Sequence, residues 1–356
     1  MSASSTMPLA EHWCDSELLE CVSIVSETPT TSSFTFKAPS GASFNYKPGQ
    51  FLTLEIPVED GVVYRTYTIS SSPTRPYLLT LTVKVHENSV GTRWMMDCLE
   101  PGMLLKVIGP AGEFTNSDSK AKKFAFISAG SGITPMMSML TAMQDAGCEL
   151  DVVFIHSART VDEIIFRQHL SDIASQCSGL DLHFVVSQPN VSKAWGGYQG
   201  RINSIMLQAM APDLLEREVY CCGPEAFMAS VKAMLKESDY DMENYNEESF
   251  SAPTETKLPK ADLTAVDDKK AYEVYFAKSD LSYCSNQGES ILLAARSAGI
   301  IIPSACAFGL CGTCKVKKLE GRVDMTHNGG ISQREIDDGY ILACCSYPLG
   351  DVFIDS

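Results

Sequence analysis

The chain has 356 residues, which at roughly 150 residues per domain predicts two or three domains. Apolar residues make up 45% and charged residues 20%, which excludes a fibrous or mainly disordered chain. Lys and Arg number 28 and Asp and Glu number 44, so the net charge is −16. A chain this acidic repels phosphate backbones, and we therefore expect no binding to nucleic acid.

The chain contains thirteen cysteines but shows no secretory signal, because Met1–Glu17 has no basic start and no long apolar core. It also has no apolar run of the length that spans a membrane. We therefore expect a cytoplasmic protein without a membrane partner. In a reducing compartment, so many cysteines indicate metal or redox chemistry more than disulfides.

The N-terminal part reads as short apolar or β-branched strands separated by turns such as Pro48-Gly49. These expected strands are Leu18–Val25, Ser33–Lys37, Phe51–Ile56, Thr66–Ser70 and Leu78–Val85. A series of this kind predicts an antiparallel β-barrel that ends near Gly109–Gly112.

The middle part alternates apolar strands with helices, which predicts an α/β domain with a doubly wound parallel sheet. The expected strands are Phe124–Ile127, Asp151–His156, Leu182–Val186 and Val219–Cys222. The expected helices are Pro135–Ala146, Val161–Ile173 and Pro224–Leu235. Asp239–Lys270 is rich in acidic residues, Asn, Ser and Pro and predicts a linker, with the exception of a motif at Glu248–Phe250. Ala271–Ser356 resumes with two strands, a helix at Ser290–Ala298, a cysteine-rich loop and two more short strands.

The cysteine-rich loop carries the strongest motif of the sequence. Cys306, Cys311 and Cys314 follow the spacing C-x4-C-x2-C, and 29 residues separate Cys314 from Cys344. This spacing is typical of the plant-type [2Fe–2S] cluster, in which four thiolates hold two irons. Glycines at 309 and 312 let the backbone approach the sulfides. A zinc site is disfavoured because it needs two short pairs, and four unrelated buried cysteines are the other alternative.

Cys345 competes with Cys344 as the fourth ligand. The segment Leu342–Pro348 resembles the closing strand of plant-type ferredoxins, and that resemblance implies Cys344 as the ligand. The whole region Tyr272–Ile354 resembles the β-grasp ferredoxin domain.

Arg65, Tyr67 and Thr68 lie on an expected strand, where a guanidinium can clamp a diphosphate and a Tyr can cover a flat ring. On spacing alone an ordinary strand with an exposed Arg is the better interpretation. The segment resembles the R-x-Y-[ST]-x-x-[ST] flavin signature of the ferredoxin-NADP⁺ reductase superfamily. Two further segments resemble the same superfamily and occur in the same order. Val90-Gly91-Thr92 resembles the flavin phosphate segment of the superfamily, and Gly109–Phe114 resembles the turn that closes its flavin barrel. Together they imply FAD, with FMN as an alternative.

The turn after the first middle strand contains Gly130, Gly132, Thr134 and Pro135. Glycines let a pyrophosphate approach, and Pro suits the start of a helix. A plain strand-to-helix turn is the alternative. The segment resembles the G-x-G-I-T-P loop that binds pyridine nucleotide in the same superfamily.

Cys222, Gly223 and Pro224 resemble the superfamily's C-G-P motif, whose Cys lies beside the nicotinamide; a buried strand Cys is the alternative. Glu248 and Phe250 resemble the E-x-F ending of related NAD domains, whose aromatic lies near the flavin; otherwise they are linker residues.

Arg159 follows the second middle strand and could bind a 2′-phosphate, yet it also occurs in relatives that use NADH. A Ser-Arg pair typical of NADPH enzymes is missing after the third strand, which favours NADH over NADPH.

The resemblance covers nearly the whole chain and implies a multidomain oxidoreductase. The expected domains are an FAD-binding barrel at 14–117, an NAD(P)-binding domain at 118–250, a linker at 251–270 and a [2Fe–2S] ferredoxin domain at 271–356. A flavin converts the two-electron hydride of NADH into single electrons for a cluster. The order resembles reductases of Rieske-type oxygenases, nearest to those of glycine betaine or carnitine monooxygenases, and it implies an electron-acceptor protein as partner. A hybrid-cluster-protein reductase and a degenerate ferredoxin-like carrier are the alternatives.

Overall fold

We analysed a computed structural model of the chain. It describes residues 12–14, 17–58, 61–86, 89–188, 195–250, 271–286, 288–304, 309, 312–327 and 330–356. The chain forms two compact units. The first comprises Met1–Leu52, Tyr67–Pro110 and Phe114–Phe250, and the second comprises Thr53–Thr66, Ala111–Glu113 and Ser251–Ser356.

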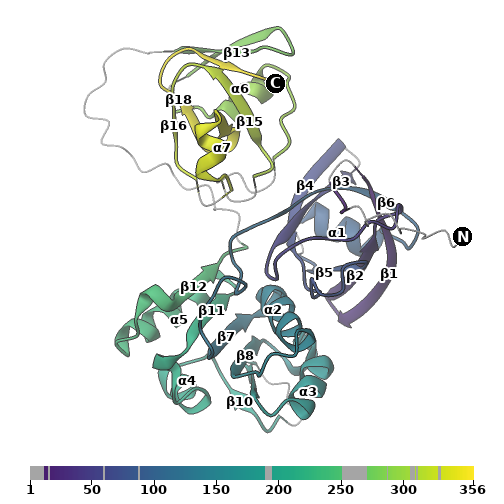
Figure 1. Cartoon of the computed structure of the whole chain (residues 1–356), viewed down its shortest axis with the longest axis vertical. Helices are drawn as coiled ribbons and strands as arrows, with labels where there is room; N and C mark the ends of the chain where they lie inside the picture. Colours follow the sequence, from purple (N-terminus) through teal and green to yellow (C-terminus); the bar gives the residue numbers. More distant parts are fainter. Residues whose placement is uncertain are drawn as a thin grey trace, which may run out of the picture. The chain divides into compact units, whose positions relative to one another are not determined.

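The N-terminal strands form one six-stranded sheet in the order β4-β3-β6-β1-β2-β5. Its strands are β1 (Leu19–Thr28), β2 (Thr31–Lys37), β3 (Phe51–Val58), β4 (Gly61–Thr68), β5 (Leu79–Lys84) and β6 (Leu104–Ala111). β1 pairs antiparallel with β2 and β6, and β2 pairs antiparallel with β5. An antiparallel bridge between Ile69 and Leu81 joins the end of β4 to β5 and so connects the two edges of the sheet. The expected antiparallel barrel is confirmed (Figure 1).

Alternation explains why these segments are strands. In β2 the side chains of Phe34 and Phe36 are fully buried, and in β5 those of Leu79 and Leu81 are buried in the same way. Successive residues of a strand point to opposite faces, so one face of each strand fills the interior. Two elements of this part were not expected from the sequence, namely β6 and the helix α1 (Val90–Asp97).

The middle part forms a parallel sheet in the order β10-β9-β8-β7-β11-β12. Its strands are β7 (Phe124–Ala129), β8 (Val152–Ala158), β9 (Leu180–Val186), β10 (Tyr198–Gln199), β11 (Glu218–Cys222) and β12 (Tyr245–Glu248). Its helices are α2 (Ile133–Asp145), α3 (Arg167–Gln176), α4 (Ser204–Met210) and α5 (Glu225–Glu237). Every residue of β7 is buried, as expected of a central strand with helices on both faces.

The two faces of this sheet carry separate cores. One core joins strand residues such as Phe126 and Phe154 to α2 and α3, and the other joins Ile127 and Ile155 to α4 and α5. In Figure 1 the two helix pairs accordingly lie on opposite sides of β7, β8 and β11. The expected doubly wound parallel sheet is confirmed.

The helix expected at Val161–Ile173 is wrong in its first half. The chain forms a short 3₁₀ turn at Val161–Glu163, and α3 begins only at Arg167. Between them Ile164, Ile165 and Phe166 are all buried, and Phe166 has a left-handed φ of 57°. A residue in the left-handed region cannot continue a right-handed helix, and therefore the helix is interrupted at Phe166.

The linker expected from Asp239 is wrong for Tyr245–Glu248, which forms β12. This strand pairs in parallel with β11 along its whole length and is the edge strand of the sheet. An edge strand with one exposed side tolerates polar residues, which is why the composition suggested a linker. Residues 251–270 lie outside the described residues.

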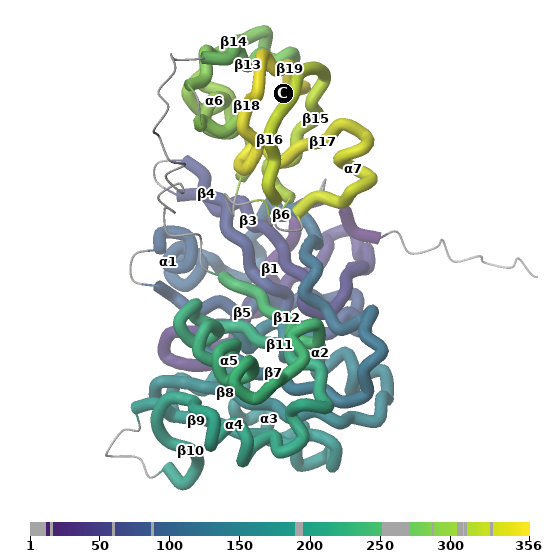
Figure 2. Tube along the Cα trace, turned by 90° about the vertical axis from the view of Figure 1, so that its left-hand side faces the viewer, coloured from purple at the N-terminus to yellow at the C-terminus, as the bar shows by residue number. Residues whose placement is uncertain are grey.

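The C-terminal part forms a mixed sheet in the order β14-β13-β19-β15-β17 and a ladder of β16 with β18, which lie side by side in Figure 2. Its strands are β13 (Tyr272–Phe276), β14 (Leu281–Ser285), β15 (Lys315–Glu320), β16 (Val323–Met325), β17 (Tyr340–Leu342), β18 (Ser346–Pro348) and β19 (Val352–Ile354). β13 and β19 are parallel, and α6 (Ile291–Ser297) packs on the same core. This is the expected β-grasp arrangement.

The expectation of only two strands after the cysteine-rich loop is wrong. The described residues contain five strands there and the helix α7 (Gln333–Asp337). Four of these strands have three residues, which is too short for an alternating pattern to stand out. None of the helices in the described residues combines the length and the apolar character needed to cross a membrane.

Candidate active site

The carboxyl edge of the parallel sheet brings two of the expected motifs together. A Cβ atom placed on Gly132 would lie 2.2 Å from the carbonyl oxygen of Cys222 and 2.6 Å from the nitrogen of Gly223. No residue other than glycine fits this approach. The turn after β7 and the turn after β11 therefore form one continuous backbone surface, and ligands of open α/β sheets bind at this edge.

The turn after β7 is a 3₁₀ segment, η1 (Gly130–Gly132), that leads directly into α2. Gly130 has φ of 55°, a conformation that side chains disfavour. Thr134 is buried, and its hydroxyl donates to the carbonyl of Ser131 at 3.1 Å. The helix begins at Ile133, two residues before the expected start, so Pro135 occupies the first turn, where no N–H is required. The N-terminus of α2 thus lies directly beside a glycine turn, an arrangement that suits a phosphate.

Cys222 and Glu248 end neighbouring strands and are register partners. Both are buried, and the Oε2 atom of Glu248 has no hydrogen-bond partner within the described part of the chain. Burial raises the pKa of Glu248 to about 8. Burial, and then the neighbouring Glu248, raises the pKa of the Cys222 thiol well above its usual value. At neutral pH the edge therefore presents a neutral thiol beside a protonated carboxyl group, which can donate a hydrogen bond.

Pro224 lies two residues after Cys222 and is the N-cap of α5, with an extended backbone. Phe250 lies two residues beyond Glu248 and exposes 42% of its surface. An aromatic ring this exposed leaves apolar area available for a bound group. The expected pairing of Phe250 with a flavin stays a prediction.

His156 is a fully buried residue at the end of β8. Its Nδ1 atom lies 2.9 Å from the hydroxyl of Ser128, the neighbouring position on β7. Its Nε2 atom has no partner in the described residues. Burial, helped by the positive charge of Lys84, lowers the pKa of His156 to about 3, so its ring is neutral.

Arg159 follows β8 and belongs to a small charged cluster. Its Nε atom lies 3.3 Å from Oε2 of Glu163, and the Nζ atom of Lys84 donates to the same oxygen at 2.9 Å. The side chains of Lys84 and Glu163 are mostly buried, whereas 66% of the Arg159 side chain is exposed. Lys84 ends β5 of the barrel, so this cluster also connects the barrel to the parallel sheet.

The expected flavin strand is β4. Along it Arg65 is exposed, Tyr67 is half-buried and Thr68 is buried. Arg65 and Tyr67 are two residues apart and therefore share one face of the strand. The chain then continues to Ser71, whose carbonyl accepts a hydrogen bond from the hydroxyl of Ser138 on α2 at 2.6 Å. This contact ties the segment after β4 to the helix that starts at the glycine turn.

Val90, Gly91 and Thr92, the expected phosphate segment, form the first turn of α1. Ser89 caps this helix, and its hydroxyl accepts from the N–H of Thr92 at 3.4 Å. Gly91 and Thr92 are buried, whereas Val90 is exposed. A helix N-terminus offers N–H groups to a phosphate, in keeping with the expected role.

Two of the four expected cluster ligands lie among the described residues. The N–H of Cys344 points at Sγ of Cys314, at 3.4 Å, and both cysteines are buried. Backbone donors to sulfur of this kind stabilise thiolates. Cys306 and Cys311 lie outside the described residues. In the part that is described, no group of three or more His, Cys, Asp or Glu is placed to hold a metal.

The glycines of the cysteine-rich loop have the geometry that a tight loop requires. Gly309 and Gly312 have φ of 74° and 70°. A Cβ atom on Gly309 would lie 2.7 Å from Sγ of Cys345 and 2.9 Å from the Cα atom of His327. Cys345 is therefore packed directly against Gly309, and its thiol points at the carbonyl of Leu342 at 3.7 Å.

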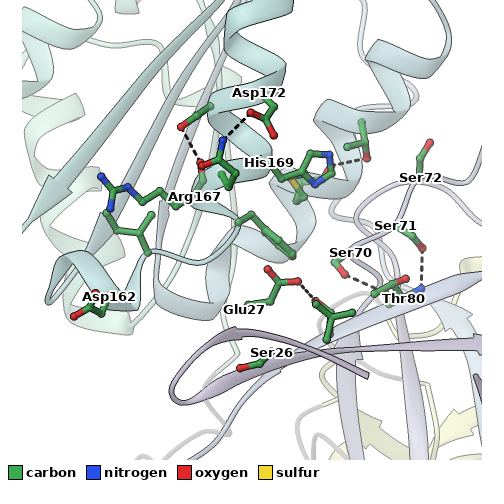
Figure 3. A pocket seen from close by; sticks show the side chains of 18 of the residues that line it. Ser26, Glu27, Ser70, Ser71, Ser72, Thr80, Asp162, Arg167, His169 and Asp172 are labelled. Atoms are coloured by element: carbon green, nitrogen blue, oxygen red, sulfur yellow. Dashed lines mark hydrogen bonds between the residues drawn. The ribbon is translucent and has the colours of Figure 1, made fainter. Parts of the chain in front are cut away.

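A separate pocket of about 1070 Å³ lies among β1, the segment after β4, and the residues around the start of α3. Figure 3 shows its hydroxyl-bearing and charged side chains, among them Ser26, Glu27 and Arg167. None of the described residues that line it is an expected cofactor residue. Val161 and Asp162, in the turn that follows β8, also line the pocket.

Sequence reasoning missed Lys84 and Glu163. A signal for Glu163 existed, because an acidic residue after the second strand of a nucleotide-binding sheet is a known ribose contact. No local signal marked Lys84, which reaches the cluster from another part of the fold.

Three family models match the chain in order. They are described as an oxidoreductase FAD-binding domain over residues 19–116, an oxidoreductase NAD-binding domain over 126–233 and a 2Fe-2S iron-sulfur cluster binding domain over 275–349. The chain is thus an oxidoreductase with flavin, pyridine-nucleotide and iron–sulfur domains. These matches confirm the expected kinds of cofactor, which are FAD, a nicotinamide nucleotide and a [2Fe–2S] cluster.

Characterised relatives are similar over the full length. The chain is 50% identical to the stachydrine N-demethylase reductase subunit of Rhizobium meliloti, over 97% of this chain and 98% of that protein. It is 40% identical to the glycine betaine monooxygenase reductase subunit of Pseudomonas aeruginosa, over 100% of both. The solved structure of phthalate dioxygenase reductase, described as a modular structure for electron transfer from pyridine nucleotides to [2Fe-2S], matches with a TM-score of 0.60 and 25% identity, over 95% of this chain and 97% of that one. The chain belongs to this family of flavin and iron–sulfur reductases.

Proposed function

We propose that the protein carries electrons from NADH through FAD and the [2Fe–2S] cluster to a Rieske-type oxygenase. The observation that carries this proposal is the carboxyl edge, where Gly132 touches the backbone of Cys222 and Cys222 pairs with buried Glu248. Bound FAD supplies the chemistry that accepts a hydride and releases single electrons. The protein's own residues bind, orient and shield the reacting groups.

The residues take the following proposed roles. The first turn of α2 and the adjoining glycine turn would hold the pyrophosphate of NADH, and Cys222 would lie beside the nicotinamide. The full set of proposed nucleotide contacts is Gly130, Gly132, Thr134, Pro135, Arg159, Cys222, Gly223 and Pro224. The proposed flavin contacts are Arg65, Tyr67, Thr68, Val90, Gly91, Thr92, Glu248 and Phe250. The proposed cluster ligands are Cys306, Cys311, Cys314 and Cys344.

Burial supports the shielding role of this edge. Cys222 and Glu248 are both closed to water, and a dry site strengthens each polar interaction inside it. The protonated carboxyl of Glu248 would hold one proton at this edge, where it could donate a hydrogen bond to a bound group. The domain boundaries that go with these roles are 14–117, 118–250, 251–270 and 271–356.

For the terminal reaction we propose demethylation of a quaternary ammonium compound such as glycine betaine. Two relatives that match over nearly their full length are named for stachydrine and for glycine betaine. Both compounds are betaines with a quaternary nitrogen. The partner would then be an oxygenase subunit that binds the betaine and receives electrons from this chain, in the cytoplasm.

The test is reconstitution with a purified Rieske-type oxygenase subunit from the same genome. We expect oxygenase-dependent NADH oxidation and one formaldehyde per NADH when glycine betaine or stachydrine is added. Omitting the reductase, or using Cys314→Ser, should abolish formaldehyde formation. NADH-driven reduction of a hybrid-cluster protein without any reduction of the oxygenase would contradict the proposal.

A further inference from the structure

Helix α2 is anchored at two points to the barrel segment that follows the expected flavin strand. In its second turn, the hydroxyl of Ser138 donates to the carbonyl of Ser71 at 2.6 Å, and Ser138 is fully buried. Its last residue, Asp145, accepts from Nε and Nη2 of Arg75 at 2.9 and 2.7 Å. The hydroxyl of Thr74 donates to the same carboxylate at 2.6 Å. A forked pair of this kind fixes direction as well as distance.

Between the two anchors the helix also packs tightly on the barrel. Gly49, in the turn before β3, has φ of 93°, and a Cβ atom there would lie 2.8 Å from Cε of Met139. The same Cβ atom would overlap the carbonyl oxygen of Phe114. Met139 is fully buried. Surfaces packed this closely cannot slide past each other without opening voids, so α2 and the barrel move together.

The segment that receives these contacts is itself held by the barrel. The hydroxyl of Ser71 accepts from the N–H of Thr80 on β5 at 2.9 Å (Figure 3) and lies 3.0 Å from the hydroxyl of Tyr46. Ser72 is fully buried, and its hydroxyl lies 2.7 Å from that of Thr74. Burial raises the pKa of Tyr46, so its hydroxyl stays protonated and serves as a donor. The anchors of α2 therefore connect to the body of the barrel.

The two sides of this contact lie close to the proposed binding places of the reacting groups. Ser71 comes three residues after Thr68, the end of β4, and three residues span at most about 11 Å. Ser138 lies about 8 Å along α2 from its first residue, and the glycine turn comes immediately before that residue. Gly132 in that turn touches the backbone of Cys222. A displacement of α2 against the barrel would therefore move the nucleotide turn against the flavin strand.

We propose that Ser138, Arg75 and Asp145 are positioning residues for hydride transfer. They hold the nicotinamide, bound beside Cys222, at the distance and angle from the flavin along β4 that transfer requires. In this step a C–H bond of NADH breaks and its hydrogen leaves with both bonding electrons for the flavin. NADH is thereby oxidised to NAD⁺, and the flavin is reduced by two electrons. The proposal rests on the nucleotide and flavin placement of the proposed function and is independent of the oxygenase partner.

A purely structural role predicts a different behaviour. Because 60% of the Arg75 side chain is exposed, its ion pair with Asp145 contributes little to the free energy of unfolding. Partial burial by itself would raise the pKa of Asp145, but the hydrogen bonds from Arg75 and Thr74 hold it below its usual value, so the pair stays ionised at neutral pH. Anchors that served folding alone would affect the melting temperature and leave the reduction rate of the folded protein unchanged. Anchors that position the helix would affect the rate while NAD⁺ and FAD stay bound.

Two variants weaken one anchor each. Ser138→Ala removes a donor to the carbonyl of Ser71, which keeps the hydroxyl of Tyr46 as a second donor at 3.2 Å. Arg75→Lys keeps the positive charge but cannot form the fork to Asp145. Because α2 retains one anchor in each variant, we expect modest single effects and a more than additive effect when the two are combined.

The experiment uses the complete protein with FAD and its cluster, without oxygen. It measures the stopped-flow rate of flavin bleaching at saturating NADH, the long-wavelength charge-transfer absorbance of the reduced flavin with NAD⁺, and the dissociation constant of NAD⁺. We expect each single variant to slow the rate about threefold and the double variant about thirtyfold to a hundredfold, because a displacement of about 1 Å costs about a hundredfold. The charge-transfer absorbance depends on contact between the two rings and should fall in the same order. The dissociation constant should change less than about twofold.

The matched control is Thr141→Val, one turn along α2 from Ser138, because this buried hydroxyl donates to the Met137 carbonyl of the same helix at 2.7 Å. We expect it to lower the melting temperature about as much as Ser138→Ala and to keep the rate and the absorbance within about twofold of the wild type. Thermal melting establishes that each variant is folded, and Arg75→Lys, at an exposed position, provides the test by itself where Ser138→Ala melts below the working temperature.

Equal slowing in Thr141→Val, or an unchanged rate and absorbance in the double variant, would overturn the proposal. A wild-type protein whose flavin is not reduced by NADH would overturn the proposed function itself. A fast wild type with an equally fast double variant would overturn only the positioning roles.

Discussion

Cys222 and Glu248 are register partners at the ends of β11 and β12. Both side chains are buried at the carboxyl edge of the sheet, close to the glycine turn that follows β7. A thiol and a carboxyl group thus share a dry site, and the carboxyl group has an oxygen without a protein partner in the described residues. A polar atom left open at a ligand-binding edge marks a place where a bound group completes the hydrogen bonding. The pair is therefore the natural focus for experiments on this protein.

Stability should fall with rising pH because of Glu248. Burial raises its pKa to about 8 in the folded chain, against roughly 4.5 when unfolded. Between these two pH values the folded state binds more protons than the unfolded state. The contribution of Glu248 to stability is therefore fully present below about pH 4.5 and is lost as pH rises through about 8. Glu248→Gln should remove this loss, which amounts to at most about 5 kcal/mol in the free energy of unfolding. The melting temperature of the variant should therefore exceed that of the wild type, by a margin that grows from pH 6 to 8.5. Parallel melting curves at all pH values would show that Glu248 is ionised or solvated.

His156 should have the opposite pH dependence. Burial lowers its pKa to about 3, against roughly 6.5 when unfolded. Its contribution to stability is present above about pH 6.5 and is lost as pH falls towards 3. His156→Gln should flatten the acid side of the stability profile, measured by denaturant unfolding between pH 4 and 7. His183→Gln is a suitable control, because His183 lies on the neighbouring strand β9 and keeps a carboxylate partner in Asp181.

Cys222→Ser should slow flavin reduction by NADH about tenfold to a hundredfold, because a small displacement beside the nicotinamide is costly. Stopped-flow measurement of flavin bleaching checks this rate. Cys221→Ser is the matched control, since Cys221 is equally buried but packs into the core on the other face of the sheet. Each substitution should cost about 1–3 kcal/mol of stability, but only Cys222→Ser should change the rate. Equal slowing in both variants would point to a general loss of packing.

Gly132→Ala should weaken nucleotide binding and lower stability by about 1–3 kcal/mol, because the new methyl group would overlap the carbonyl of Cys222. Gly196→Ala is the control, since a Cβ atom there meets nothing within 4 Å. The measurements are the dissociation constant of NAD⁺ and the melting temperature. Unchanged NAD⁺ affinity in Gly132→Ala would place the nucleotide elsewhere.

Cys314→Ser and Cys344→Ser should each abolish the visible absorbance and the paramagnetic signal of the [2Fe–2S] cluster. NADH-to-ferricyanide activity should survive within about twofold in both, because each cofactor is held by its own residues. Cys345→Ser decides between the neighbouring thiols, and we expect it to keep the cluster. Cys284→Ser, at an exposed position of the same unit, should behave as the wild type. Loss of the cluster in Cys345→Ser but not in Cys344→Ser would reverse the ligand assignment.

The sequence predicted the architecture well where one physical pattern dominated. The fully buried strand β7 and the alternating strand β2 each carry a clear periodicity, and both were located to within about two residues. The break before α3 was missed because Ile164–Phe166 reads as ordinary helix sequence. Only the tertiary structure shows that Ile164 packs in one core and Ile165 and Phe166 in another, with a left-handed backbone at Phe166.

The candidate site was predicted to a similar degree. Motifs within one turn, such as Gly130–Pro135, could be proposed from their resemblance to a known loop. Contacts that join distant segments could not, as with Lys84 and Glu163, or with the packing of Gly309 against Cys345. The polar edge strand β12 was partly assigned to a linker because its position in the sheet, and not its composition, makes it a strand.

The close approach of Gly132 to the carbonyl of Cys222 has a consequence for engineering and for evolutionary change. The turn after β7 and the end of β11 are about ninety residues apart in the chain, yet neither can move without the other. Transplanting only one of them into a related reductase should therefore fail, whereas exchanging both as a matched pair should preserve hydride transfer.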